Sequence, residues 1–190
     1  GFNALDDNTT ADYNSAFGMN ALSANTTGAD NTAVGYNALT ASTTAGNNTA
    51  VGSYALSANT TGTNSVAVGH DALKSQTTAD RNTALGHNSQ DATTTGGSNT
   101  SVGDESMSAN TTGANNTAVG VFALDAATTV SHNTAIGYNA GTDTTGGQNT
   151  FLGSTTGVQI TSGTNNVHVG YDIGHAGNIS NSIGIGRNLT

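Results

Sequence analysis

Residues 31–35 read NTAVG, and the same five residues return at 48–52 and at 116–120. Close variants occupy the turns between them, so that a glycine preceded by a large apolar residue recurs every seventeen residues. Two intervals are one residue shorter, from Gly137 to Gly153 and from Gly170 to Gly186. A fixed period of this length indicates repeats that stack on one another, and the stacking then decides the fold.

The stretch around Val34 has the alternation of a short strand. Thr32 and Val34 are expected on one face of an extended segment, and Asn31, Ala33 and Gly35 on the other. The β-branched residues, the frequent asparagines and the recurring glycine all disfavour a helix. Gly35 is placed to end the strand and turn the chain. We therefore expect an all-β protein, a parallel β-roll or solenoid with about 17 residues per turn.

Stacked repeats place equivalent residues in columns, about 4.8 Å apart along the rod. The pre-glycine column holds the large apolar residues Phe17, Val34, Val51, Val68, Leu85, Val102, Val119, Ile136, Leu152, Val169 and Ile185. The leucine column holds Leu22, Leu39, Leu56, Leu73, Met107 and Leu124. The two alanine columns run through Ala16, Ala33, Ala50, Ala67, Ala84, Ala118 and Ala135, and through Ala21, Ala38, Ala55, Ala72, Ala123 and Ala140.

Two polar columns run beside them. The asparagine column holds Asn14, Asn31, Asn48, Asn82, Asn99, Asn116, Asn133, Asn149 and Asn166, and stacked asparagines are expected to form amide ladders. The threonine column holds Thr26, Thr43, Thr60, Thr77, Thr94, Thr111, Thr128 and Thr145. Eleven turns predict a rod roughly 50 Å long.

Composition restricts the partners. Charged residues make up 8% of the chain, its net charge is −9, and Lys74, Arg81 and Arg187 are its only Lys or Arg residues. We therefore expect neither nucleic-acid binding nor attachment to an anionic membrane surface. No apolar run is long enough to span a bilayer, so direct membrane insertion of this segment is not expected either. The chain has no cysteine, which excludes disulfides and thiol chemistry.

Two segments are expected along the chain, regular repeats over residues 1–140 and divergent repeats of the same roll over 141–190. In the second segment the leucine column is lost, Phe151 and His168 replace alanines, and residues 175–180 predict an irregular turn. We expect a change of cross-section there, as in a transition to another fibre segment. Because the repeat pattern reaches both ends, we expect the chain to be a piece of a longer polypeptide.

Residues 64–69 read NSVAVG, which resembles the NSVAIG-type repeat in the heads of trimeric autotransporter adhesins. The variants NTAVG and NTAIG (133–137) are similar to repeats of those adhesins and of bacteriophage tail fibres. The resemblance implies a left-handed parallel β-roll in a homotrimer. It also implies that the pre-glycine column faces the interior of each roll, while the alanine and asparagine columns lie toward the trimer axis or line the turns. The repeat here is longer than in the adhesin heads, and threonine replaces valine in most turns.

Self-association is also expected from the thin interior. Each turn carries about two large apolar residues, which is little for a chain that must order seventeen residues. Small residues in the alanine columns would let neighbouring chains approach closely. We therefore expect an intertwined or side-by-side homo-oligomer that buries these columns, which the resemblance implies is a homotrimer.

The residue after each recurring glycine is the most varied position of the repeat. A candidate exposed contact column follows from it: Tyr36, His70, His87, Asp104, Tyr138 and Tyr171. His70, His87 and Asp104 would stack on consecutive turns, where they could bind a metal or present a strip to a sugar. Two stacked histidines are not a metal motif by spacing, and an exposed turn position is the simpler interpretation. We therefore assign no catalytic, cofactor-binding or metal-binding residue, and no cofactor.

These features predict a structural segment of an extracellular trimeric fibre, an adhesin or surface appendage on the cell surface. It would serve as a spacer and as an adhesive surface toward a host surface or glycan. One alternative is the shaft of a bacteriophage tail fibre on a virion. Another is an ice-binding monomeric solenoid, although a Thr-x-Thr alternation is missing. We do not expect an enzyme, because neither GxSxG nor HExxH is present.

Overall fold

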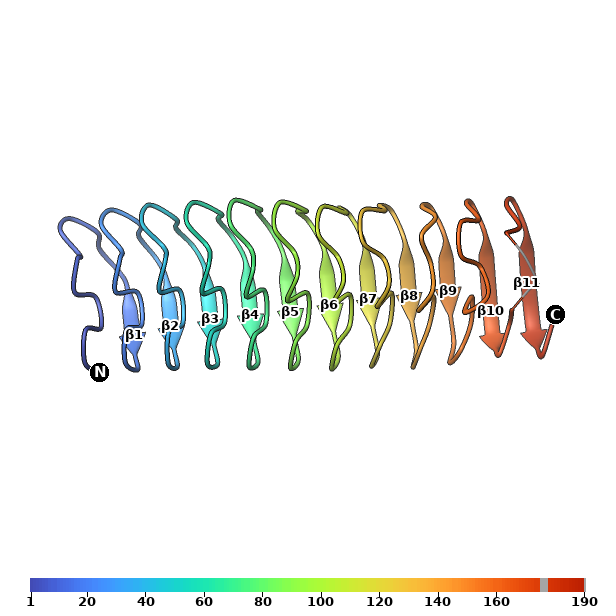
Figure 1. Cartoon of the computed structure of the whole chain (residues 1–190), viewed down its shortest axis with the longest axis horizontal. Coiled ribbons are helices and arrows are strands. Elements are labelled where there is room, and N and C mark those ends of the chain that lie inside the picture. Colours follow the sequence, from blue (N-terminus) through green and yellow to red (C-terminus); the bar gives the residue numbers. More distant parts are fainter. Residues whose placement is uncertain (175–177, 190) are drawn as a thin grey trace.

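The computed structural model describes residues 1–174 and 178–189, which form a rod of stacked turns (Figure 1). Within these residues eleven short strands pair in parallel, in chain order, as one sheet, and no helix is found. The strands are β1 Ser15–Phe17, β2 Thr32–Val34, β3 Thr49–Val51, β4 Val66–Val68, β5 Thr83–Leu85, β6 Thr100–Val102, β7 Thr117–Val119, β8 Thr134–Ile136, β9 Thr150–Leu152, β10 Val167–Tyr171 and β11 Ile183–Arg187. The predicted all-β parallel solenoid is therefore confirmed.

The recurring glycine fixes the spacing between turns. Thr32, Ala33 and Val34 pair with the residues seventeen positions later in the chain. Gly35 has a φ of 138°, and a Cβ on it would lie 2.5 Å from the carbonyl oxygen of Gly52 on the next turn. Only a residue without a side chain permits both this conformation and this approach.

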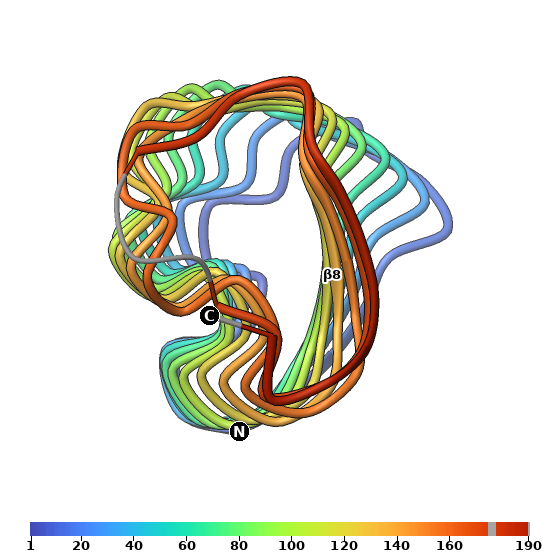
Figure 2. The ribbon, with the colours of Figure 1, turned by 90° about the vertical axis from the view of Figure 1, so that its right-hand side faces the viewer.

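The core is narrow and lies between the sheet and the opposite wall of each turn (Figure 2). Ala33 and Leu39 are both fully buried, as are the other alanines and leucines of their columns from Ala21 to Ala140. The predicted stacking of equivalent apolar residues is therefore confirmed for the leucine and alanine columns.

The pre-glycine column was expected to face the interior, and this prediction is wrong. Val34 and Leu85 are each 41% exposed and Ile136 is 39% exposed. Because side chains alternate along a strand, only one of Ala33 and Val34 can point inward. The leucine column fills the space opposite the sheet, which leaves room for a methyl group there. The alanine columns are consequently core, and the expectation that a trimer contact would bury them is also wrong.

The segment after each glycine is not a second strand but a hydrogen-bonded zigzag. Asn37 and Leu39 both have left-handed φ values, 55° and 51°, with Ala38 between them. The Leu39 amide donates to the carbonyl of Ala55 on the next turn, at 3.0 Å. This local conformation turns the leucine side chain into the core.

The asparagine column forms a ladder, but mainly between side chain and backbone. Asn48 is buried, its Oδ1 accepts from the Ser65 amide at 2.9 Å, and its Nδ2 donates to the Gly62 carbonyl at 2.9 Å. A direct amide–amide bond links Asn116 to Asn99, at 3.2 Å. Hydroxyls of the threonine column donate to the carbonyl of the next threonine along the rod in most turns. These bonds satisfy buried polar groups and hold each turn to the next.

In the last third of the rod the large core residue changes sides. Phe151 on β9 is fully buried where earlier turns have alanine. Gly141 and Gly157 replace leucine on the opposite wall, and a Cβ on either would lie 2.6 Å or less from the Phe151 ring. The sheet continues through β11. The division into segments 1–140 and 141–190 stays a prediction, and part of the expected irregular turn (175–177) lies outside the described residues.

The hydrophobic core is interrupted near the middle of the rod. One apolar cluster ends at Ala84 and the next begins at Met107. Between them four buried polar residues occupy core positions, and we call them the polar layer: Ser89, Gln90, Ser101 and Ser106. The Ser101 hydroxyl bonds to those of Ser89, at 2.6 Å, and Ser106. These turns therefore hold together through hydrogen bonds where their neighbours use apolar contacts.

Candidate functional site

The six residues of the contact column are all exposed, each at the end of a strand where the glycine turns the chain. They fall into separate groups along the rod. Tyr138 packs its ring edge-on to Phe122, with centroids 6.5 Å apart. Tyr171 carries the Arg187 guanidinium 5.4 Å from its ring centroid. The others lie on earlier turns, so the column is not one continuous surface.

The earlier group is a run of rings on four consecutive turns. Tyr36 meets Tyr54 edge-on at 5.2 Å, Tyr54 meets His70 at 6.4 Å, and His70 stacks on His87 at 5.6 Å. Lys74 lies 5.6 Å from the Tyr54 ring centroid. Hydrogen bonding to Tyr36 raises the pKa of the Tyr54 phenol. Sequence reasoning missed Tyr54 because it follows its glycine by two positions.

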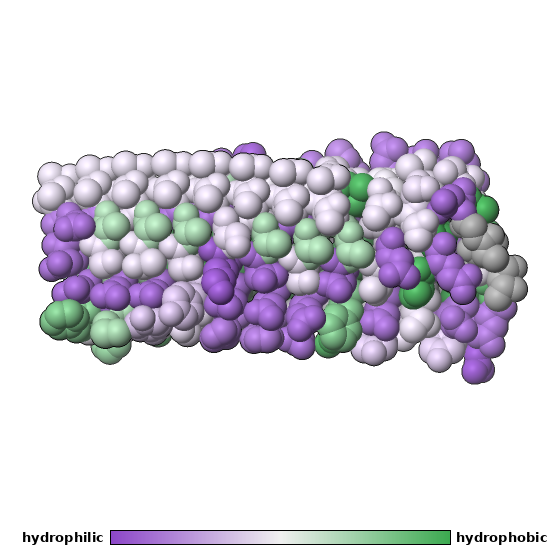
Figure 3. Space-filling view, viewed as in Figure 1, coloured by the Kyte–Doolittle hydropathy of each residue, from purple (hydrophilic) through white to green (hydrophobic). Residues whose placement is uncertain are grey.

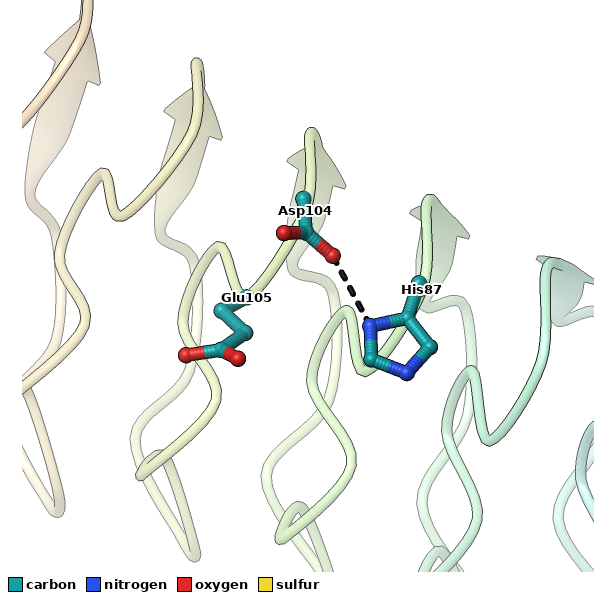
Figure 4. Close-up of side chains that lie close together, drawn as sticks. All are labelled: His87, Asp104 and Glu105. Atoms are coloured by element: carbon teal, nitrogen blue, oxygen red, sulfur yellow. Dashed lines mark hydrogen bonds and ion pairs between the residues drawn. The ribbon is translucent and has the colours of Figure 1, made fainter.

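At the end of this run, His87, Asp104 and Glu105 bring together one imidazole and two carboxylates (Figure 4). One ligand atom of each lies within 4.8 Å of the others, and Nδ1 of His87 is 2.9 Å from Oδ1 of Asp104. The stacking of His87 and Asp104 on consecutive turns agrees with the sequence prediction. The sequence analysis missed Glu105, which follows Asp104 in the chain. Its left-handed φ of 51° places it beside the contact column.

A second surface was also missed, and we call it the outward strand face. It comprises the pre-glycine column and the first residues of the strands, Ser15, Thr32, Thr49, Val66, Thr83, Thr100, Thr117, Thr134, Thr150, Val167 and Ile183. Most strands therefore present Thr-x-Val or Thr-x-Leu/Ile outward. None of these residues is charged, although the chain carries twelve acidic residues.

The turn side of the rod differs from this face. Figure 3 shows that hydrophilic and near-neutral residues dominate it, with one row of weakly hydrophobic residues along the rod and strongly hydrophobic residues at a few places. A row of threonines at one corner is exposed in every repeat from Thr10 to Thr129: Thr10, Thr27, Thr44, Thr61, Thr78, Thr95, Thr112 and Thr129. Apolar exposure is therefore most continuous along the outward strand face.

No cavity of ligand size is found among the described residues, and no helix that could cross a membrane. A scan against protein-family models and searches of curated proteins and of solved structures found no match. The expectation that the chain is not an enzyme stays a prediction.

Proposed function

We propose that this chain is a structural segment of an extracellular homotrimeric fibre. One observation carries the proposal, namely the uncharged outward strand face with its row of apolar side chains, each of them partly or largely exposed. Soluble monomers rarely leave a contiguous apolar patch uncovered over such a length, roughly 50 Å for eleven strands. A chain of net charge −9 is repelled by its own copies except where charge is absent, and this face is such a place.

A threefold axis along the rod fits this face. Parallel copies at equal height would bring Val51 of one chain toward the same residue in the others, and likewise on every turn. The strands alone cover about 500 Å² (roughly 50 Å by 10 Å), which is less than the roughly 800 Å² per partner of a stable interface. The flanking columns would therefore have to join the contact.

Charge on the face tests the proposal. Analytical ultracentrifugation of the wild-type chain should give three chains per particle at about 10 µM. Val51→Glu with Val119→Glu should dissociate it, because charges would meet at the axis without partners. Thr61→Glu with Thr112→Glu adds the same charge at the exposed corner and should leave the trimer intact. A wild-type monomer throughout would contradict the proposal.

The placement on a cell surface as an adhesin or appendage is supported by the resemblance of residues 64–69 to adhesin heads. The bacteriophage tail-fibre shaft, on a virion, is the alternative within the same architecture. Flanking sequence separates them, since an outer-membrane anchor would support the first and a virion-attachment domain the second. In both the adhesin and the tail-fibre shaft, the chain would associate with two further copies of itself. A host surface or glycan is the proposed partner outside the fibre.

Ice binding by the monomer is a second candidate, and the outward strand face favours it as well. Thr32 and Val34 repeat outward at a spacing of about 4.8 Å, giving the regular hydroxyl and methyl array that the linear sequence did not make obvious. Thermal hysteresis by a monomer, abolished by the Val51→Glu and Val119→Glu pair, would support it. A stable trimer without thermal hysteresis would exclude it.

A further inference from the structure

The cluster of His87, Asp104 and Glu105 has the composition of a divalent-metal site. Imidazole and carboxylate are both ligands of Zn²⁺, bound at about 2.0–2.2 Å. Two ligands of a tetrahedral Zn²⁺ ion lie about 3.3 Å apart, and His87 Nδ1 and Asp104 Oδ1, at 2.9 Å, would need to separate only slightly to admit the ion. Glu105 closes the remaining distance by rotating a side chain that solvent reaches.

The His70 ring lies beside the cluster on the preceding turn. The His70 ring stacks on His87 with an angle of 26° between the planes. On that turn Lys74 pairs with Asp71 at 3.0 Å. The cluster itself offers a cation two carboxylates and one imidazole.

The position of the cluster along the rod is an independent observation. His87 and Ser89 belong to one turn, and Asp104, Glu105 and Ser106 belong to the next. These are the turns of the polar layer, where the apolar core is interrupted between Ala84 and Met107. A metal held by both turns would join them from outside at the place where apolar contacts between them are fewest.

We propose that His87, Asp104 and Glu105 bind one Zn²⁺ per chain and that the ion clamps these two turns together. The site lies on one chain, so the proposal does not depend on the trimer. Binding adds stability because the folded chain presents the ligands together and the unfolded chain does not.

The test uses the 190-residue chain after dialysis against a chelator. Calorimetric titration with Zn²⁺ should give one site per chain, and the melting temperature should rise with zinc. His87→Ala and Glu105→Gln should each weaken binding about tenfold or more and remove the zinc-dependent part of the melting shift. His132→Ala and Asp143→Asn alter an exposed histidine and an exposed carboxylate on other turns and should change neither.

Two results would overturn the proposal. One is the absence of saturable binding at up to about 1 mM zinc. The other is equal affinity in the wild type, His87→Ala and Glu105→Gln, which would show that zinc binds elsewhere. Circular dichroism of the apo variants shows whether they fold, and both substitutions lie on exposed or half-exposed side chains outside the core.

Discussion

The turns around Leu56 and those of the polar layer share one backbone but not one core. Around Leu56 the inward positions hold leucine and alanine, all fully buried. In the polar layer the same positions hold Gln90 and three serines, equally buried. The strands β3 to β6 pair in the same register in both regions. The backbone ladders and the glycine therefore specify the fold, while the inward residues set how strongly adjacent turns hold together.

The largest expected effect is in the apolar region. Leu56→Ala should destabilise the chain by about 2–5 kcal/mol, because it leaves a cavity in a narrow core whose backbone ladders resist collapse. Urea unfolding followed by circular dichroism measures the change. Thr61→Ala, at an exposed position of the same repeat, should stay within about 0.5 kcal/mol. Equal losses in the two variants would mean that leucines contribute little to stability.

Two buried glutamines should respond with opposite signs. Gln76 has partners on both sides, since Nε2 donates to Ser65 Oγ at 3.2 Å and Oε1 accepts from Asn82 at 2.9 Å. Gln76→Leu should cost about 1–3 kcal/mol, because it leaves buried groups unpaired. Gln90 is bonded at one end only, since Nε2 donates to the Thr83 carbonyl at 3.2 Å while Oε1 is buried without a hydrogen-bond partner. Gln90→Leu removes this unpaired acceptor and should stabilise by up to about 1 kcal/mol. Destabilisation by both variants would contradict this difference.

The three serines of the polar layer should be nearly dispensable together. Replacing Ser89, Ser101 and Ser106 with alanine extends the alanine columns. It removes hydroxyls that bond to one another and to the backbone carbonyls of Ser101, Gly103 and Ser106. The free energy of unfolding should change by less than about 1 kcal/mol, since the hydroxyls are removed together and the Gly103 and Ser106 carbonyls keep their bonds to backbone amides. Ser101→Ala alone should be worse than the triple variant. The comparison is again by urea unfolding, and a loss above 2 kcal/mol in the triple variant would show that this network stabilises the fold.

The period of the repeat predicts the solenoid, its strands and their parallel register. It could not tell which face of the strand was inside. Thr32 and Val34 alternate with Ala33, and either set could in principle form a core. The choice of Ala33 follows from Leu39, whose left-handed φ turns it into the space opposite the sheet. A non-glycine residue in that conformation is uncommon, so the sequence alone does not suggest it.

The same conformation explains what was missed at the candidate site. His87 and Asp104 could be placed together, because stacking follows from the seventeen-residue period. Tyr54 and Glu105 could not, since they occupy the left-handed position one residue further on, with φ values of 59° and 51°. Stacking predicts neighbours along the rod well, whereas neighbours across a turn depend on dihedral angles that no period encodes.

The smallest expected effect is a pH dependence at Asp91, on a turn of the polar layer. Burial raises the pKa of its carboxyl above the ordinary value. Folded chains therefore hold this proton more tightly than unfolded ones, so ionisation of Asp91 opposes folding above its folded pKa. The penalty is lost as the pH falls toward the unfolded value, about 3.9. Asp91→Asn should raise the melting temperature slightly at pH 7, by less than Gln90→Leu does, and should have no effect below about pH 3.5.

Asp143→Asn removes an exposed charge in the apolar-core region and corrects for the change in net charge. If the two asparagine variants change the melting temperature equally at both pH values, burial of the Asp91 carboxyl does not destabilise the fold. Any difference in stability between the polar layer and the turns around Leu56 would then come from the core residues alone.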